Sequence, residues 1–147
     1  MTYIRMMIHC VWSTKNREPQ LVNKDYRIQL FEHIRIHSYN KGIYIDTIGG
    51  DKEHVHCLIS LGGMQNIAKI IQLIKGESSF WFNKKGWNTL QWQDDYFAVS
   101  IGESQVDIVR RYIHNQEEHH KRKSFDVEYK EFMVKYNFQG KDKEKFG

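Results

Sequence analysis

The order of apolar periodicities constrains the fold of this chain more than any other feature. Alternation typical of strands occurs at residues 3–14, 44–48, 54–61 and 96–101. Apolar residues at helical spacing occupy the segment from Asn23 to Asn40 and residues 65–83. The resulting βαββαβ order is that of the ferredoxin-like, or split βαβ, fold. We therefore expect an α+β chain with an antiparallel sheet and two helices on one of its faces.

Two further helices are predicted after these six elements. Ser104 and Asp107 are spaced as a capping box for a third helix that runs to Arg122, and Ser124 is a plausible start for a fourth. The third helix could cover the open sheet face. Because no repeat or linker interrupts the 147 residues, we expect a single domain over 1–147, with 141–147 as a flexible charged tail.

Composition narrows the class of protein. No apolar run approaches the ~18 residues that span a bilayer, and no signal peptide is recognisable, so neither membrane insertion nor secretion is expected. Two cysteines, Cys10 and Cys57, lie in apolar strand-like segments and favour a reduced, cytoplasmic protein. The net charge of +4 is compatible with a nucleic-acid partner without establishing one.

Residues 53–60, EHVHCLIS, place two histidines on one face of a predicted strand. Since side chains alternate along a strand, His54 and His56 point one way, and Val55 and Cys57 point the other. The two histidine α-carbons are about 6.7 Å apart, close enough for both rings to bind one metal ion. In a chain with eight histidines such a pair arises readily by chance, so the motif is weak alone.

Residues 110–120, RRYIHNQEEHH, supply the chemistry that would complete this site. Tyr112 and Gln116 are four apart, which puts them on one helix face. Two histidine nitrogens and the Gln116 amide oxygen would leave open positions on a metal, as catalysis requires. Tyr112 could then attack a phosphodiester by transesterification. The spacing also fits a packed tyrosine and a solvated glutamine, and either His119 or His120 could replace Gln116 as ligand.

Together these segments resemble the HUH single-tyrosine transposases of the insertion-sequence family two-hundred/six-hundred-and-five. Five fragments occur in order: IHCVWSTKNREP, GGDKEHVHCLISL, IKGESSFWFN, WQDDYFAVS and RRYIHNQEEHHKRKSFDVEY. The late segment SFDVEYKEF is similar to the branch associated with repetitive extragenic palindromes (REP). Glu53 stands where aspartate is expected, and Asp95 stands where glycine is frequent.

The resemblance implies a transposase that cleaves and rejoins single-stranded DNA at hairpin-flanked ends through a 5′-phosphotyrosine intermediate. It implies Tyr112 as nucleophile and His54, His56 and Gln116 as metal ligands. Oxygen donors favour Mg²⁺ or Mn²⁺, although histidine nitrogens alone would favour zinc. A homodimer is also implied, because in many members the tyrosine helix of one subunit completes the histidine site of the other.

Basic residues flank the same elements and are candidates for phosphate contacts, which position DNA without reading its sequence. They are Lys15, Arg17, Lys75, Lys84, Lys85, Arg110, Arg111, Lys121, Arg122 and Lys123. For the last three, a solvated final helical turn is an equally good explanation. Trp81, Trp87 and Trp92 are candidates for stacking on unpaired bases, with core packing the alternative for Trp81.

Three other functions remain open from the sequence. The first is a non-catalytic domain that binds single-stranded nucleic acid, which would leave the two histidines, Tyr112 and Gln116 unexplained. The second is a metal-dependent phosphoesterase for small nucleotides, in which Tyr112 only positions the substrate. The third is a purely structural protein, which explains the fewest of these residues.

Overall fold

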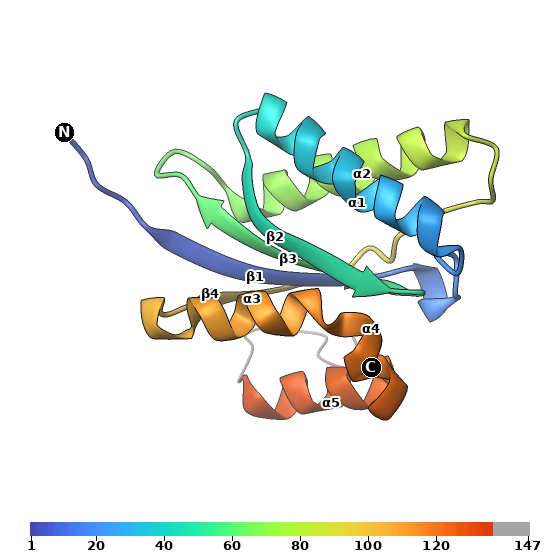
Figure 1. Ribbon diagram of the computed structural model, residues 1–147. Helices are drawn as coiled ribbons and strands as arrows, with labels where there is room; N and C mark the ends of the chain where they lie inside the picture. The colour runs from blue at the N-terminus through green and yellow to red at the C-terminus, as the bar shows by residue number, and fades with distance from the viewer. Residues whose placement is uncertain (137–147) are drawn as a thin grey trace.

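The computed structural model describes residues 1–136, and its elements follow the predicted order (Figure 1). The ferredoxin-like unit consists of β1 (Met6–Ser13), α1 (Lys24–Asn40), β2 (Tyr44–Asp51), β3 (His54–Leu61), α2 (Ile67–Lys84) and β4 (Phe97–Ile101). The sheet order is β2-β3-β1-β4, and every neighbouring pair is antiparallel. The predicted α+β fold is therefore confirmed. The predicted tail, 141–147, lies outside the described residues.

Helices cover both faces of the sheet (Figure 1). α1 and α2 pack side by side on one face. On the other lie α3 (Val106–His114), α4 (Gln116–Arg122) and α5 (Phe125–Lys135). Short 3-10 turns, η1 (Lys15–Arg17) and η2 (Glu103–Gln105), follow β1 and precede α3. The expectation that a late helix covers the open face is correct, and α5 joins it there.

The α1–α2 face encloses the main apolar core. Alternation along β3 directs Val55, Cys57 and Ile59 into this core, as predicted. Their partners from the helices include Leu30, Ile34, Ile71, Ile74 and Phe82. Asn23, at the predicted start of this helix, caps α1 by accepting a hydrogen bond from the Tyr26 amide at 3.1 Å.

Two strand boundaries differ from the predictions. β1 begins at Met6 rather than residue 3, and β2 continues to Asp51 rather than ending at residue 48. Gly49 pairs with His56 in the sheet. A β-carbon on Gly49 would lie 2.3 Å from the backbone oxygen of Ile113. This glycine therefore allows α3 to approach the sheet closely instead of making a turn.

The predicted third helix is wrong in two details. Ser104 lies in η2 and does not cap α3, whose preceding residue makes no side-chain cap. Asp107 instead accepts a hydrogen bond from Arg110 at 2.7 Å, because the guanidinium one turn later attracts its carboxylate. The helix is also interrupted at Asn115, where the backbone leaves helical geometry (φ −99°, ψ 21°) and α4 begins.

The two cysteines face each other in the register of β1 and β3, and both thiols are free and buried. Burial raises the pKa of the Cys10 thiol to about 12, which makes it unreactive. Across residues 1–136, no helix combines the length and apolar character needed to cross a membrane.

Candidate active site

The structure brings the predicted nucleophile Tyr112 and the three predicted metal ligands together between the sheet and the α3–α5 layer. His54 and His56 are fully buried on the β3 face opposite the main core. Their ring centroids are 5.1 Å apart, and the Tyr112 ring lies 5.5 Å from that of His56. Gln116 is buried at the start of α4. All four belong to one chain, so this arrangement requires no residue from a second subunit.

Three neighbours fix the orientation of His54. Its Nδ1 lies 2.6 Å from Glu53 Oε1, and its ring stacks on Phe125 at 4.1 Å. A carboxylate at Nδ1 favours the tautomer that carries its proton there, which directs the lone pair of Nε2 outward. Nε2 lies 2.9 Å from Gln116 Oε1, which is also an acceptor. In this tautomer the two acceptors could share a cation, and in the other tautomer Nε2 donates a hydrogen bond to the amide oxygen.

His56 lies in a second chain of contacts. Its Nδ1 is 2.9 Å from Nε2 of His9 on β1, and its Nε2 is 3.1 Å from Glu128 Oε1 on α5. Burial lowers the pKa of His56 to about 4 and that of His9 to about 3. Both rings are therefore neutral at physiological pH, the form in which imidazole binds metals.

Glu128 connects the tyrosine to this chain. The Tyr112 hydroxyl donates a hydrogen bond to Glu128 Oε2, and His120 Nε2 lies 3.3 Å from the same oxygen. Burial opposes ionisation of Glu128, but hydrogen bonds from His120 and His56 outweigh it and hold its pKa well below the usual range. Burial, reinforced by the Glu128 charge, raises the pKa of Tyr112, so this hydroxyl keeps its proton at neutral pH.

The donor set fits a hard divalent ion. Ligands at about 2.1 Å in adjacent octahedral positions are about 3.0 Å apart. The spacings of 2.9 Å between His54 and Gln116 and 3.1 Å between His56 and Glu128 match this value. The available donor atoms of His54, His56 and Glu128 all lie within 4.8 Å of one another. Two nitrogens with nearby amide and carboxylate oxygens suit Mn²⁺ or Mg²⁺.

Sequence reasoning missed three residues of this site: His9, Glu53 and Glu128. Alternation in β1 puts His9 on the same sheet face as the histidine pair, a signal that could have identified it. Glu53 directly precedes His54 but was assigned no role. No local pattern in α5 distinguishes Glu128, because only the docking of that helix brings it to Tyr112.

The basic residues predicted to contact phosphate fall into two groups: those with a partner within the chain and those that are exposed. Most belong to the first group. Lys75 Nζ donates to the backbone carbonyl of Asp94 at 2.9 Å, and Arg110 donates to Asp46 at 2.8 Å. Lys121 and Lys123 pair with Glu118 and Glu131, and Lys84 and Lys85 lie over the rings of Phe80 and Trp81. Lys15, Arg111 and Arg122 are exposed. Phosphate binding by any member of the set stays a prediction.

The three predicted stacking tryptophans pack against the α1–α2 core. Trp81 stacks on His33 and Trp87 stacks on Tyr26, both at 4.1 Å between ring centroids. The Trp92 indole donates a hydrogen bond to Ser78 Oγ at 3.0 Å. Their contacts with the core account for their positions, and stacking on bases stays a prediction.

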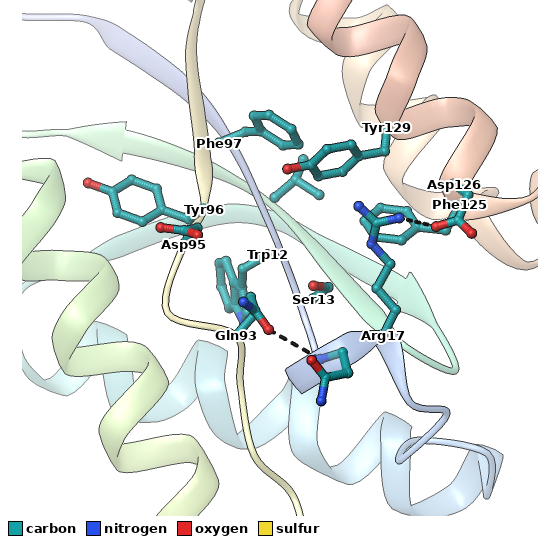
Figure 2. A pocket seen from close by; sticks show the side chains of 12 residues that line it. Trp12, Ser13, Arg17, Gln93, Asp95, Tyr96, Phe97, Phe125, Asp126 and Tyr129 are labelled. Carbon is teal, nitrogen blue, oxygen red and sulfur yellow. Dashed lines mark hydrogen bonds and ion pairs between the residues drawn. The ribbon is translucent and has the colours of Figure 1, made fainter. Parts of the chain in front are cut away.

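A cleft of about 470 Å³ adjoins the histidine site (Figure 2). Its aromatic wall consists of Trp12, Tyr96, Phe97, Phe125 and Tyr129, and Phe125 is the ring that stacks on His54. Arg17 extends along this wall, pairs with Asp126 and lies 4.3 Å from the centroid of the Tyr129 ring. Asn16 and Gln93 add polar groups to the lining of the cleft.

Comparisons with known proteins identify the family and the fold. The model of the family described as "Transposase IS200 like" matches residues 2–116. Two solved structures share the fold, each with a TM-score of 0.61. A putative transposase from Deinococcus radiodurans R1 is 20% identical over 78% of this chain and 93% of its own. A REP-associated tyrosine transposase bound to a REP hairpin is 21% identical over 82% of this chain and 72% of its own. A search of curated proteins finds no match.

Proposed function

Because the chain belongs to the IS200-like transposase family, we propose that it cleaves and rejoins single-stranded DNA through Tyr112 in a metal-dependent transesterification. The observation that carries this proposal is the meeting of the Tyr112 hydroxyl, the buried His54 and His56 rings and the buried Glu128 carboxylate in one site. Each of these groups is costly to bury. Together they supply a nucleophile, metal-binding nitrogens and a proton acceptor, which attack on a phosphodiester requires.

The residues that would hold the ion are His54 and His56, each through Nε2, and Gln116 through its amide oxygen. We propose Mg²⁺ or Mn²⁺, which would act as a Lewis acid on the phosphate oxygens. Glu53 and His9 orient the two rings from behind, because each contacts the Nδ1 that faces away from the ion.

Tyr112 provides the nucleophile and Glu128 receives its proton. The tyrosine oxygen loses its affinity for the proton as it bonds to phosphorus, so the proton passes to Glu128 Oε2, the atom that it already contacts. From there it passes to solvent, because the depressed pKa of this carboxylate does not retain it. The bond from phosphorus to the 3′ oxygen breaks, and that oxygen leaves as a hydroxyl with a proton from solvent. The phosphate remains as a 5′-phosphotyrosine ester. Attack on this ester by a 3′-hydroxyl rejoins DNA without an external energy source.

We assign unpaired nucleotides next to the scissile phosphate to the cleft of Figure 2. Aromatic rings and a guanidinium offer stacking surfaces that tolerate any base, and Phe125 links the cleft to His54.

Hairpin DNA is the proposed partner, supported by the family and by the hairpin-bound neighbour. A homodimer is also proposed from the family resemblance alone, with each subunit containing its own complete site. Since Tyr112 lies beside the histidines of its own chain, we infer that cleavage takes place within one subunit.

The decisive experiment is covalent trapping. Labelled single-stranded hairpins from the sequence flanking the gene are incubated with protein and Mn²⁺ and separated on a denaturing gel. We expect an adduct with wild type and with Tyr44→Phe, which alters an exposed tyrosine. We expect none with Tyr112→Phe or with the His54→Ala, His56→Ala double variant, whose folding is checked by circular dichroism.

The same gel separates the alternatives. Hairpin binding by all variants without any adduct would indicate a non-catalytic DNA-binding domain on a transposase fold. Turnover of small nucleotides without an adduct would indicate a phosphoesterase. Either result would overturn the proposed tyrosine chemistry.

A further inference from the structure

A second group of metal-binding side chains lies on the other side of the sheet. His33 and His37 project from α1, and Glu77 projects from α2. His33 Nε2 lies 2.7 Å from Glu77 Oε1 and 3.0 Å from Oε2, and His37 Nδ1 lies 3.7 Å from Oε1. The tyrosine chemistry uses none of these residues.

Local structure explains why the three side chains converge. His33 and His37 are four residues apart, so both rings lie on one face of α1. The packing of α1 beside α2 on the same sheet face brings Glu77 opposite them (Figure 1). His33 is further held between Trp81, on which it stacks at 4.1 Å with an interplanar angle of 8°, and His37 at 5.7 Å. Its orientation is therefore set by packing before any ion binds.

The spacing and the donor types favour a tetrahedral ion. Ligands at about 2.0–2.1 Å from zinc are about 3.3 Å apart. The distances of 2.7 Å and 3.7 Å from Glu77 Oε1 to the two histidines lie on either side of this value. Two imidazoles and one carboxylate form a ligand set typical of zinc, and this group lacks the additional amide oxygen that Gln116 adds to the first site and that favours Mg²⁺ or Mn²⁺ there. The side chains are 19–29% exposed, so an ion can enter and a water can complete its coordination.

We propose that His33, His37 and Glu77 form a second metal site, selective for Zn²⁺ over Mg²⁺ and Mn²⁺, that ties α1 to α2. The ion would cross-link residues 44 positions apart in the sequence. Because it binds the folded chain, it would stabilise the ferredoxin-like unit by mass action. The site lies on the face opposite Tyr112 and does not depend on the proposed DNA chemistry.

The test counts bound Zn²⁺ in wild-type protein, His37→Ala and Glu77→Gln by isothermal titration with zinc chloride. His54 and His56 would also be expected to bind added zinc, so the informative quantity is the difference in bound zinc between wild type and each variant. Each variant should bind one equivalent fewer than wild type and gain less in Tm when zinc is added. Glu32→Gln, which changes an exposed carboxylate on α1, should bind as much zinc as wild type and gain as much in Tm.

Co²⁺ provides a second readout, because tetrahedral cobalt absorbs strongly in the visible range. The wild-type spectrum should lose a tetrahedral component in both site variants. Unchanged zinc stoichiometry and unchanged Co²⁺ spectra in His37→Ala and Glu77→Gln would overturn the proposal and leave His33 and Glu77 as a hydrogen-bonded pair. Glu77→Gln preserves side-chain shape, so its result stands even if His37→Ala folds poorly.

Discussion

The two faces of the sheet are closed by different means. On the α1–α2 face, aliphatic and aromatic side chains fill the interior. On the α3–α5 face, His9, His54, His56, Gln116 and Glu128 are buried with only small apolar clusters around them. Buried polar groups cost stability unless they satisfy one another. The comparison indicates that one face supplies stability and the other holds chemistry, with β3 contributing alternate residues to each.

Acid should produce the largest effect, and it acts through the polar face. The pKa values of His56 and His9 are lowered from 6.5 to about 4 and about 3, so below pH 6.5 the unfolded chain binds protons that the folded chain refuses. Metal-free protein should lose roughly 5 kcal/mol of unfolding free energy between pH 6.5 and 4.5, at about 1.4 kcal/mol per ring per pH unit. Urea titrations in EDTA measure this loss.

Two further groups affect stability at the two ends of the range from pH 6.5 to 4.5. The pKa of Glu128 is depressed, so its contribution to the free energy of unfolding is lost only as pH falls below about 4.5. The pKa of His120 is raised, because its bonds to Glu128 outweigh burial, so its contribution is complete below pH 6.5 and is lost on going higher. His9→Gln should halve the slope between pH 6.5 and 4.5. An unchanged slope would show that His9 does not resist protonation.

The next largest effect should come from the apolar face. Phe82 is fully buried in the main core, so Phe82→Ala should cost about 3–5 kcal/mol of stability. Covalent adduct formation, measured well below the Tm, should be preserved because the site lies across the sheet. Phe80→Ala, at an exposed position of the same helix, should cost less than about 0.5 kcal/mol. Loss of the adduct in a folded Phe82→Ala protein would contradict this separation of roles.

Glu128→Gln should show the opposite of Phe82→Ala: a large loss of adduct formation with a smaller loss of stability. The amide keeps the shape of the side chain but cannot accept the Tyr112 proton as a carboxylate does. Adduct formation should fall by about 10²-fold or more, while stability should fall by only about 1–3 kcal/mol. Single-turnover trapping rates measure the first effect, and Glu131→Gln on the exposed side of α5 is the control. A wild-type rate would exclude Glu128 from the chemistry.

Two glycines provide the most closely matched comparison, and Gly76→Ala has the smallest expected effect of all these variants. Gly49→Ala puts a β-carbon against the Ile113 carbonyl, so α3 must shift. The substitution should lower the free energy of unfolding by about 1–3 kcal/mol. It should also remove most of the covalent adduct, because α3 carries Tyr112. Gly76 lies within α2, where an added β-carbon would meet no neighbouring atom within 4 Å, so Gly76→Ala should stabilise the protein by about 0.8–1 kcal/mol. Thermal melts and trapping of both variants test the pair, and equal effects would refute the close approach at Gly49.

Local patterns in the sequence determined much of this molecule. Alternation and helical spacing predict the βαββαβ order and the α1–α2 core, because both depend on residues near one another in the chain. The same alternation places His54 and His56 on one face, and Tyr112 and Gln116 follow from helical spacing and family resemblance. All four meet in the structure.

Tertiary structure alone decided the contacts between distant elements. Glu128 reaches His56 across 72 residues of sequence, and Glu77 reaches His33 across 44. Neither contact leaves a periodic signal, because each depends on how a whole helix docks. The interruption at Asn115 was unpredictable for the same reason: turning the buried Gln116 toward His54 depends on a strand 62 residues earlier. Local preferences thus specify elements and faces, while packing selects which polar groups meet between them.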